Sequence, residues 1–487
     1  MIPLPVTEIA AITGGTLMAG HLAKVSGEGA RAAAEAVVAG PVVIDSRQAV
    51  PGALFAALPG ERVDGHDYAA AAARNGAAAI LAARALPEAG APVIVVADVT
   101  LALGLLARAV LDRLPGTAVV GITGSSGKTS TKDLTAQVVE RLGPTIAPEG
   151  SLNNEIGLPL TVLRADETTR YLVLEMSARG IGHIAYLTGI APPRIGAVLN
   201  VGRAHAGEFG SIDAVAKAKG ELVEALPAGS AGGVAVLNAD DPNVAAMAAR
   251  TRARVITTSV DRAGAEPNSD ADVRASGLTL DDLGRASFTL HARAGSAPVT
   301  LTLHGGHHAA NALAAAAVAA ELGMEVPAIA DALTAATARS KKRMELTRRP
   351  DGVLVVNDAY NANPDSTRAA IEALAHLTSN GRRGIAVLGY MAELGDIANQ
   401  SHAEAGRLAA KAGAAVIVAV GAEAAAVLDG ARATDGWQGE AIAAPDPQAV
   451  VAALRSRLRP GDVVLVKASK SAGLWEVADG LLAEEHQ

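Results

Sequence analysis

The stretch AVVGITGSSGKTSTKDLT, residues 118–135, limits the possible folds of this chain more than any other. An apolar run typical of a buried β-strand leads into a glycine-rich turn, and a segment with helical spacing follows. Strand, glycine turn and helix in this order are typical of a phosphate-binding loop. Glycines let backbone N–H groups approach a phosphate, and the helix N-terminus adds a favourable dipole. The stretch therefore predicts nucleotide binding within an α/β fold.

The spacing of this loop is Gly-x-x-Gly-Lys-Thr, shorter than the common P-loop, because Ile122 stands where the first glycine would lie. Lys128 can reach the β- and γ-phosphates, and the Thr129 hydroxyl can bind Mg²⁺. The alternative is an ordinary glycine-rich turn with a surface lysine. The expected nucleotide-binding residues of the loop are Gly124, Ser125, Ser126, Gly127, Lys128, Thr129 and Ser130.

Length and composition exclude several classes of protein. The 487 residues correspond to about three domains. A net charge of −8, with no basic patch interleaved with aromatic residues, argues against nucleic-acid binding. The absence of cysteine excludes disulfides and thiolate metal sites. No signal peptide and no apolar run long enough to span a bilayer is visible, so we expect a cytoplasmic protein.

The pattern of strands and helices predicts three α/β domains, at residues 1–114, 115–338 and 339–487. Leu114-Pro115-Gly116 would end the first. In the second and third domains strands alternate with helices, which predicts parallel sheets. A Thr- and Ser-rich stretch, 261–304, predicts an antiparallel insertion before an Ala-rich helix at 308–322. The expected strands are 42–44, 54–58, 93–97, 118–122, 171–175, 195–201, 234–238, 353–357, 384–388, 415–420 and 463–467.

Four polar residues outside the loop are candidates for chemistry. Glu175 ends an apolar strand, which favours a role as a Mg²⁺ ligand over the alternatives of a helix-capping acid or a surface carboxylate. His205 follows the next strand, at the edge where ligands bind, yet a satisfied core or surface histidine is equally compatible. Asn311 lies inside an Ala-rich helix, where either a nucleotide contact or a packing hydrogen bond explains it. Nothing local distinguishes Lys219 from Lys217 on their helix.

The stretch NDAYNANPDS, residues 357–366, places many polar groups directly after a strand. It includes Asp358, Tyr360, Asn361 and Asn363. Ligands of doubly wound sheets bind at the carboxyl ends of strands, so ligand binding is the favoured interpretation. A turn followed by a helix capped at Ser366 is the alternative.

Several motifs occur in an order that resembles the Mur ligases. The similarity extends from about residue 40 to about residue 478. The motifs are TGSSGKT, SLNNEIGLPLT, YLVLEMSARGIGHIAYL, VLNVGRAHAGEFGS, AKAKGE, NADDPN, HHAANALAA, NDAYNANPDS and LGYMAELG.

The resemblance implies a small N-terminal UDP-substrate domain, a central P-loop ATPase domain and a C-terminal Rossmann-like domain. It also implies an ATP-dependent amide ligase that works through an acyl phosphate. YNANP with LGYMAELG is nearest to the members that join D-alanyl-D-alanine to UDP-N-acetylmuramoyl-tripeptide. The alternatives are a tripeptide-forming sibling, a folylpolyglutamate synthase-like enzyme, or a nucleotide-binding module without activity. We expect a monomer with no membrane span.

The metal and catalytic residues follow by resemblance. ATP and two Mg²⁺ ions would be bound, with Thr129 and Glu175 at one ion and His205 and Lys219 at the other. The matching lysine of the family is often N6-carbamoylated, which turns a cation into an anionic metal ligand. Lys128, Glu175, His205 and Lys219 are therefore the expected catalytic residues.

The remaining site residues also follow by resemblance. Nucleotide contacts would come from Asn311, Arg343, Asp358 and Tyr360. The UDP-sugar would lie against Ser46, Arg47, Asp64, Gly65 and His66, and the peptide substrates against Asn153, Asn154, Asn361, Asn363 and Lys470.

The chain departs from the family pattern at three places. Gly306 and His308 stand where relatives commonly have Arg and Asn, and Ser177 replaces a usual glycine. The identity of the third peptide residue is left open by the sequence.

Overall fold

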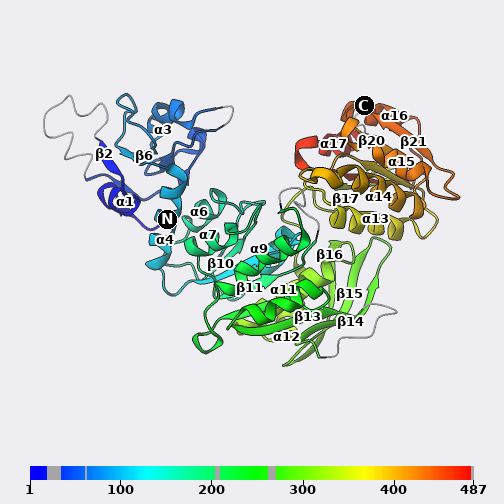
Figure 1. Cartoon of the computed structure of the whole chain (residues 1–487), viewed down its shortest axis with the longest axis horizontal. Coiled ribbons are helices and arrows are strands. Elements are labelled where there is room, and N and C mark those ends of the chain that lie inside the picture. Colours follow the sequence, from blue (N-terminus) through cyan, green and yellow to red (C-terminus); the bar gives the residue numbers. More distant parts are fainter. Residues whose placement is uncertain (19–34, 61–62, 203–208, 262–269, 484–487) are drawn as a thin grey trace. The chain divides into compact units, whose positions relative to one another are not determined.

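A computed structural model describes residues 1–18, 35–60, 63–202, 209–261 and 270–483 (Figure 1). The chain divides into two compact units. Unit 1 comprises Met1–Gly121, Leu142–Ser177 and His183–Ile195; unit 2 comprises Ile122–Arg141, Ala178–Gly182 and Gly196–Gln487. Both units are α/β, as the sequence predicts.

Unit 1 begins with a five-stranded sheet of order β2-β7-β6-β5-β4. β4 to β7 are parallel, and β2 joins the edge antiparallel. A separate two-stranded ladder joins β1 to β3. The elements are β1 (Leu4–Pro5), α1 (Val6–Thr13), β2 (Thr16–Met18), β3 (Val37–Val38), β4 (Val42–Val43), β5 (Leu54–Ala56), α3 (Ala69–Arg74), β6 (Ala79–Ala82), β7 (Val93–Val95) and α4 (Val99–Asp112).

The rest of unit 1 carries β9 (Thr145–Ile146), α6 (Gly157–Val162), β10 (Tyr171–Glu175) and α7 (His183–Ile190). β9 and β10 are parallel. The strand before the glycine-rich turn, β8 (Ala118–Thr123), crosses from unit 1 into unit 2 after Gly121. The expected strands at 118–122 and 171–175 are therefore present.

Unit 2 continues with α5 (Lys128–Val139) and a sheet of order β16-β15-β14-β13-β12-β11. β12, β13 and β14 are parallel, whereas β14, β15 and β16 are antiparallel. The antiparallel insertion expected within 261–304 is thus confirmed. The elements are β11 (Ile195–Val198), α9 (Ile212–Glu224), β12 (Val234–Asn238), α10 (Pro242–Ala245), β13 (Arg254–Val260), β14 (Val273–Leu280), β15 (Arg285–Ala292), β16 (Gly295–His304), α11 (His308–Glu321) and α12 (Val326–Ala335).

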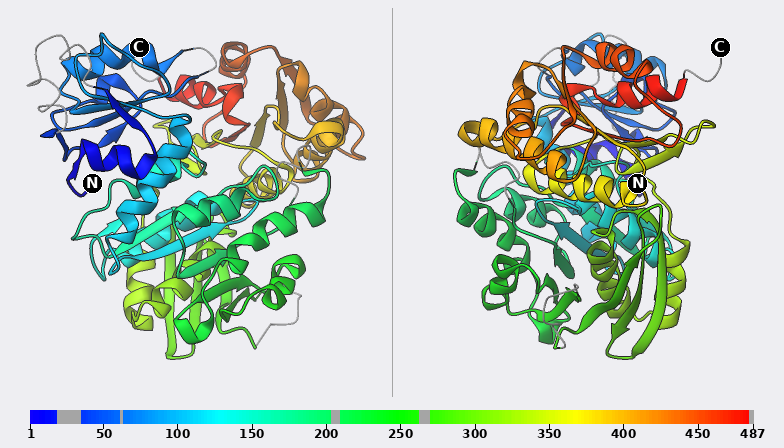
Figure 2. Two further views of the ribbon diagram at one scale, coloured as in Figure 1. Left: turned by 60° about the vertical axis from the view of Figure 1, so that its left-hand side comes forward. Right: turned by 90° about the vertical axis from the view of Figure 1, so that its right-hand side faces the viewer.

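A six-stranded sheet follows in unit 2, with the order β17-β18-β22-β19-β20-β21. All neighbours are parallel except the edge pair β17–β18. Figure 2 shows this yellow-to-red part with helices around its strands. The elements are β17 (Glu345–Arg348), β18 (Leu354–Asp358), α13 (Pro364–Thr378), β19 (Gly384–Leu388), α14 (Ala398–Lys411), β20 (Val416–Val420), α15 (Ala426–Arg432), β21 (Glu440–Ala444), α16 (Pro447–Arg455), β22 (Val463–Lys467) and α17 (Trp475–Ala483).

The strands of this sheet bury both faces, which explains their near-continuous apolar sequences. Alternate residues point to opposite sides, so Leu354 and Val356 pack with α13, α14 and α15. Val353 and Val355 pack with α16 and α17 on the other side. The doubly wound arrangement expected for this block is confirmed, and it places the carboxyl ends of β18, β22, β19 and β20 along one edge.

Alanine carries much of the packing around α11. This helix lies against α5, and its residues 311–319 are all buried. Small side chains let the two helices approach closely, which brings the N-terminal turn of α11 near the glycine-rich loop before α5.

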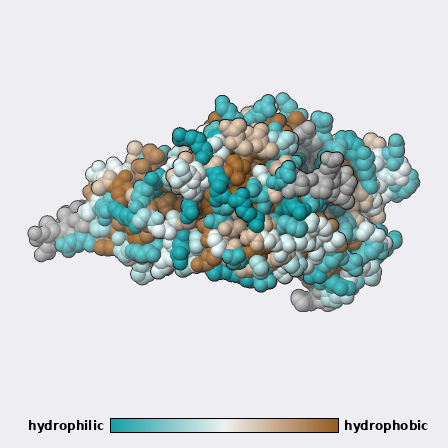
Figure 3. All heavy atoms as spheres, turned by 90° about the horizontal axis from the view of Figure 1, so that it is seen from below, coloured by the Kyte–Doolittle hydropathy of each residue, from teal (hydrophilic) through white to brown (hydrophobic). Residues whose placement is uncertain are grey.

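In Figure 3, hydrophobic and hydrophilic residues are intermixed over the visible face. Within the described ranges, no helix has the length and apolar character needed to cross a membrane.

Two glycines allow α14 and α15 to touch. A Cβ added at Gly406 would lie 1.8 Å from the carbonyl oxygen of Val427, and one at Gly430 would lie 1.8 Å from that of Ala403. No side chain larger than hydrogen fits at either position without separating the helices.

We predict that Gly406→Ala lowers the melting temperature by several degrees, because overpacking typically costs about 1–3 kcal/mol. Thermal unfolding followed by circular dichroism measures the effect. Gly189→Ala is the matched control, since Gly189 lies in α7 with nothing within 4 Å of its added Cβ. Equal melting temperatures for the two variants would contradict the close packing.

Candidate active site

The glycine-rich loop connects β8 to α5 in unit 2. Gly127 has φ +80° and is the N-terminal cap of α5, a conformation that favours glycine because it has no Cβ. Helix α5 begins at Lys128, so the loop N–H groups and the positive end of the helix dipole lie together. This is the geometry of an anion-binding cradle, as the sequence predicts.

The two residues after the cradle differ in burial. The Lys128 side chain is partly exposed, and its Nζ donates to the carbonyl of Gly124 at 2.8 Å across the loop. The Thr129 side chain is 2% exposed on the first turn of α5, and Ser130 is half-buried. Lys128 therefore folds over the loop, within which a phosphate would be bound.

Asn200, which sequence reasoning did not single out, organises the loop. It follows β11, and its Oδ1 accepts from the backbone N–H of both Ser125 and Ser126 at 2.9 Å. Its Nδ2 donates to the Ser126 carbonyl at 3.1 Å. An asparagine directly after a parallel strand, at the edge where ligands bind, was the available signal.

Lys219 is buried on α9, with 3% of its surface exposed. Desolvation lowers the pKa of its ammonium group well below the ordinary value, and the nearby positive charge of Lys128 lowers it further. Its neighbour Lys217 is exposed on the same helix. Burial therefore distinguishes Lys219 from Lys217, which the sequence alone did not. It also favours the neutral form of the Lys219 amine.

Asn311 and His308 lie at the start of α11 beside the loop. An added Cβ at Gly127 would lie 2.6 Å from Asn311 Oδ1, so this amide packs directly on the loop glycine. Asn311 Nδ2 lies 3.3 Å from His308 Nδ1. Burial lowers the pKa of His308 well below its usual range, and His307 and His304 lower it further. A neutral His308 ring accepts the amide hydrogen and so orients Asn311.

The polar turn after β18 meets the linker that precedes β17. The Arg343 guanidinium lies over the Tyr360 ring at 4.3 Å, and Lys470 Nζ lies 5.6 Å from the same ring. Arg343 Nε is buried with no hydrogen-bond partner within the described part of the chain. Asp358 accepts from the backbone N–H of Met344 at 3.1 Å. The structure therefore brings together three of the expected nucleotide residues and Lys470.

Asn363 touches the loop as well as capping a helix. Its Oδ1 accepts from the Ser366 N–H at 2.8 Å, which makes Asn363 the cap of α13 and Ser366 its capping-box partner. Its Nδ2 donates to the Ser125 carbonyl at 3.4 Å. A helix cap was the alternative to ligand binding, expected at Ser366; the cap is real, and the same side chain also contacts the phosphate loop. Asn361 contributes its carbonyl oxygen to Lys467.

Glu175 and Asn153 form a pair within unit 1. Glu175 ends β10 with 2% of its surface exposed, and Asn153 Nδ2 donates to its Oε1 at 2.6 Å. Asn154 has a local role, because its Oδ1 accepts from the Gly157 N–H at the start of α6. The Ser177 N–H donates to the Asn153 carbonyl at 3.0 Å. This contact uses only the backbone, so it does not depend on whether residue 177 is serine or the glycine usual in the family.

The residues expected at the UDP-sugar form two clusters in unit 1. His66 is buried; its Nδ1 lies 2.5 Å from Asp64, and its Nε2 accepts from the Ala83 N–H at 2.9 Å. The bonds from the His66 backbone and ring, followed by that from Arg84, lower the pKa of Asp64. Gly65 begins the turn that follows Asp64.

The second cluster lies after β4. Ser46 is buried, and its carbonyl accepts from Asn75 Nδ2 at 2.8 Å. Arg47 is highly exposed and pairs with Asp45, which holds the pKa of that carboxyl at about 2. An exposed guanidinium leaves this arginine accessible to a charged ligand.

His205 lies outside the described residues. Within the ranges that the structure describes, no group of three His, Asp or Glu side chains forms a metal cluster. Gly306, the other departure, has only Leu280 near its added Cβ.

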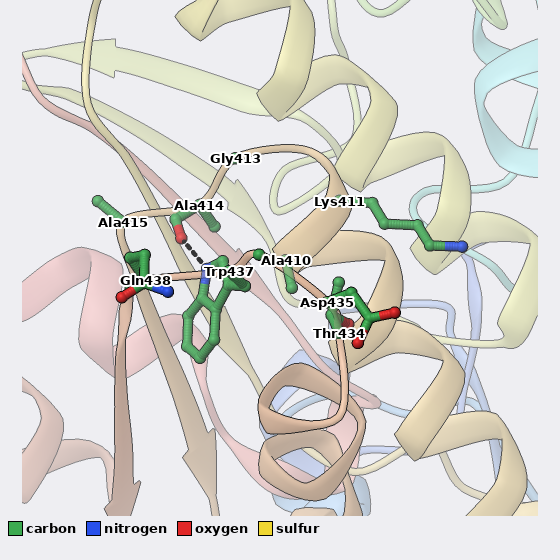
Figure 4. A pocket seen from close by; sticks show the side chains of 11 residues that line it. Ala410, Lys411, Gly413, Ala414, Ala415, Thr434, Asp435, Trp437 and Gln438 are labelled. Atoms are coloured by element: carbon green, nitrogen blue, oxygen red, sulfur yellow. Dashed lines mark hydrogen bonds between the residues drawn. The ribbon is translucent and has the colours of Figure 1, made fainter.

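An open cavity of about 610 Å³ lies elsewhere in unit 2 (Figure 4). Its wall includes the ring of Trp437, whose Nε1 donates to the Ala414 carbonyl at 2.7 Å. The cavity lies where β20 and β21 begin, whereas Asp358 and Lys467 lie where parallel strands end. It is therefore at the opposite edge of the sheet and does not belong to the candidate site.

Comparison with known proteins identifies the family of this chain. Three family models match the chain: the Mur ligase family catalytic domain over residues 41–110, the Mur ligase middle domain over 122–319, and the Mur ligase glutamate ligase domain over 342–470. The UDP-N-acetylmuramoyl-tripeptide–D-alanyl-D-alanine ligase of Mycobacterium tuberculosis is 49% identical, covering 100% of this chain and 99% of the relative.

Solved structures give the same result. MurF from Acinetobacter baumannii matches with a TM-score of 0.84 and 30% identity, covering 99% of each chain. MurF ligase from Thermotoga maritima in complex with ADP matches with a TM-score of 0.77 and 29% identity, covering 92% of this chain and 98% of that one. With this similarity along its whole length and a phosphate loop of the expected geometry, the chain belongs to the Mur ligase family.

Proposed function

We propose that the chain is an ATP-dependent amide ligase that adds D-alanyl-D-alanine to UDP-N-acetylmuramoyl-tripeptide, forming the pentapeptide precursor of peptidoglycan. The observation that carries the proposal is the 49% identity, over the whole chain, to a relative of that name. The ADP complex of the Thermotoga maritima relative supports ATP as the phosphate donor.

The reaction has two chemical steps. A terminal carboxylate oxygen of the tripeptide attacks the γ-phosphorus of ATP, and the bond to ADP breaks to leave an acyl phosphate. The amine of D-alanyl-D-alanine then attacks the acyl carbon. The tetrahedral intermediate loses phosphate and the amine loses a proton, which leaves the new amide.

The first step brings a carboxylate against a triphosphate, so like charges must be offset. The loop N–H groups, the α5 dipole and Lys128 supply positive potential where charge develops, and positioning supplies the rest. Asn200, Asn311 and Asn363 contact the loop from three different elements and keep it in one shape. These contacts support a cradle prepared before the nucleotide binds.

The residues present also fit magnesium, a hard cation that prefers oxygen ligands. We propose that Thr129 and Glu175 hold one ion and that His205 and N6-carbamoylated Lys219 hold a second. Magnesium would neutralise phosphate charge there. The neutral amine that burial favours at Lys219 supports the carbamate, because only an unprotonated amine adds to carbon dioxide.

The remaining expectations extend the proposal. Arg343, Asp358, Tyr360 and Asn311 would contact the nucleoside, and Lys470, Asn361, Asn153 and Asn154 the peptide substrates. Three domains, at 1–114, 115–338 and 339–487, would carry the three substrate sites. We place this reaction in the cytoplasm, where ATP and UDP-linked precursors are made, and propose a monomer.

Phosphate release tests the reaction directly. With ATP, Mg²⁺ and UDP-N-acetylmuramoyl-tripeptide, we expect sustained release only when D-alanyl-D-alanine is added, with the pentapeptide product detected by mass spectrometry. Release that responds to a single amino acid instead would identify a sibling ligase. No substrate-dependent release would leave only nucleotide binding.

We predict that Lys128→Ala lowers the rate of phosphate release at least about a hundredfold, because one preorganised cation is lost from the developing charge. Lys217→Ala, which removes an exposed lysine, should retain normal turnover. Near-normal release by Lys128→Ala would refute its role at the phosphates.

We predict a carbamate on Lys219 that is visible without turnover. With ¹³C-bicarbonate, the protein should show a ¹³C carbamate signal that Lys217→Ala retains and Lys219→Ala loses. The signal should fade on acidification, since protonation below the lowered pKa removes the free amine. A ¹³C carbamate signal that is unchanged in Lys219→Ala would contradict the assignment.

Lys219→Ala should also regain part of its turnover when a short carboxylate is added.

A further inference from the structure

Lys467 is a buried ammonium at the end of β22. Its side chain is 2% exposed, and in the parallel register it stands opposite Asp358 at the end of β18. Burying a charge is costly unless a partner of opposite sign and further hydrogen bonds compensate for the lost water. Sequence analysis did not single out this lysine, which ends an otherwise apolar strand.

Among the described residues, the polar contacts of the Lys467 ammonium go to one short turn. Its Nζ lies 2.7 Å from Asp358 Oδ2 and donates to the Asn361 carbonyl at 2.6 Å. The Asp358 carbonyl lies farther away, at 3.5 Å. An ammonium has three donors, and here they face the two ends of the turn 358–361. Lys467 therefore fixes the shape of the turn that carries Tyr360.

The same ion pair reaches the linker before β17. The other Asp358 oxygen, Oδ1, accepts from the Met344 N–H at 3.1 Å, and the Tyr360 N–H donates to the Lys342 carbonyl at 3.2 Å. Lys342 and Met344 have φ of +62° and +51°, a left-handed backbone that non-glycine residues adopt only when their surroundings hold them there. The turn and the Asp358 carboxylate provide part of that restraint, and Glu345, whose Oε2 accepts from the Lys342 N–H at 2.9 Å, provides the rest.

Arg343 lies between these two strained residues. Its guanidinium stacks on Tyr360 at 4.3 Å, while its buried Nε has no hydrogen-bond partner in the described part of the chain. In this stacked pair, the position of Arg343 thus depends on the linker, and the position of Tyr360 depends on the turn. The Asp358–Lys467 ion pair contacts both the linker and the turn.

We propose that Lys467 is a positioning residue for the nucleotide, acting through Asp358 and the turn to hold the Arg343–Tyr360 pair in its binding geometry. This inference rests on the proposed function, because it takes that pair to contact ATP. Lys467 itself does not touch the reacting atoms: its Nζ is directed into the protein.

Steady-state kinetics of Lys467→Met tests the proposal. We expect KM for ATP to rise about tenfold or more, while KM for the tripeptide changes less than about twofold. Lys411→Met, which removes an exposed lysine at the end of α14, is the matched control and should behave as the unmodified chain does. Equal rises in both KM values, or no rise for ATP, would overturn the positioning role.

The double variant Lys467→Met/Asp358→Asn covers the case in which the single variant does not fold. It removes both charges, so no unpaired ion stays buried. Both residues act through one contact, so the two substitutions should not add. We therefore expect the KM for ATP of the double variant to exceed that of the unmodified chain, but not to exceed the higher KM found among the single variants, Lys467→Met and Asp358→Asn, that fold. A KM for ATP equal to that of the unmodified chain would overturn the proposal.

Trp475 gives a readout that needs no turnover. Lys342 Nζ lies 3.8 Å from the Trp475 ring, so displacement of the linker changes the surroundings of this indole. In a Trp437→Phe background only Trp475 emits. We expect Lys467→Met, or the double variant, to shift this emission and increase its quenching by acrylamide, and Lys411→Met to do neither.

The two measurements separate the two hypotheses. If the unmodified chain shows no substrate-dependent phosphate release but the Trp475 emission still shifts, the proposed function fails and the anchoring of the linker stands. If the chain is an active ligase and neither KM for ATP nor Trp475 emission changes in the Lys467 variants, the positioning role is wrong.

Discussion

The candidate site depends on how two buried lysine side chains are compensated for the loss of water. One forms an ion pair with a carboxylate, whereas burial favours the neutral form of the other. Lys467 meets Asp358 at 2.7 Å, and the resulting ion pair shapes a turn and a linker. Lys219 is buried to a similar degree, but desolvation lowers the pKa of its ammonium group, and the positive charge of Lys128 lowers that pKa further. The same side chain can therefore serve as a structural cation in one place and as a neutral amine, available to react, in another.

Three carboxamides from outside the phosphate loop contact it, in addition to the contact of Lys128 with Gly124 across the loop. Asn200 binds two loop N–H groups, Asn311 packs on Gly127, and Asn363 donates to the Ser125 carbonyl. An amide both donates and accepts without adding net charge. It can therefore hold a backbone loop firmly without competing electrostatically with the phosphates that the loop is built to bind.

The sequence predicted those parts of the structure that depend on local pattern. The loop at 124–129 and the strands before and after it follow from the spacing of apolar residues and glycines. The antiparallel insertion follows from a composition rich in Thr and Ser. The strand expected at 195–201 is shorter, because β11 ends at Val198 and the chain then turns so that Asn200 faces the loop. Strands β6 and β21 were not expected, since alanine, which makes up much of both, favours helices and is depleted in strands.

The residues that sequence analysis missed act over long range. Asn200 and Lys467 acquire their roles only when the fold brings distant segments together. The position of Asn200 after a strand indicated a ligand-binding edge, but it did not indicate which residues Asn200 would contact. The family resemblance supplied Lys219, whose local pattern matches that of Lys217; burial on α9 is what separates the two. For Glu175, by contrast, a strand end in the sequence was enough to indicate a buried carboxylate.

The double contact of Asn363 links two events that are usually treated separately. One amide group caps α13 and also holds the loop carbonyl of Ser125, so the first turn of the helix and the shape of the loop share a restraint. Fraying of α13 and rearrangement of the loop are therefore thermodynamically coupled. Whatever tightens the loop should slow hydrogen exchange at the Ser366 amide, which makes that amide a built-in reporter of events at the phosphates.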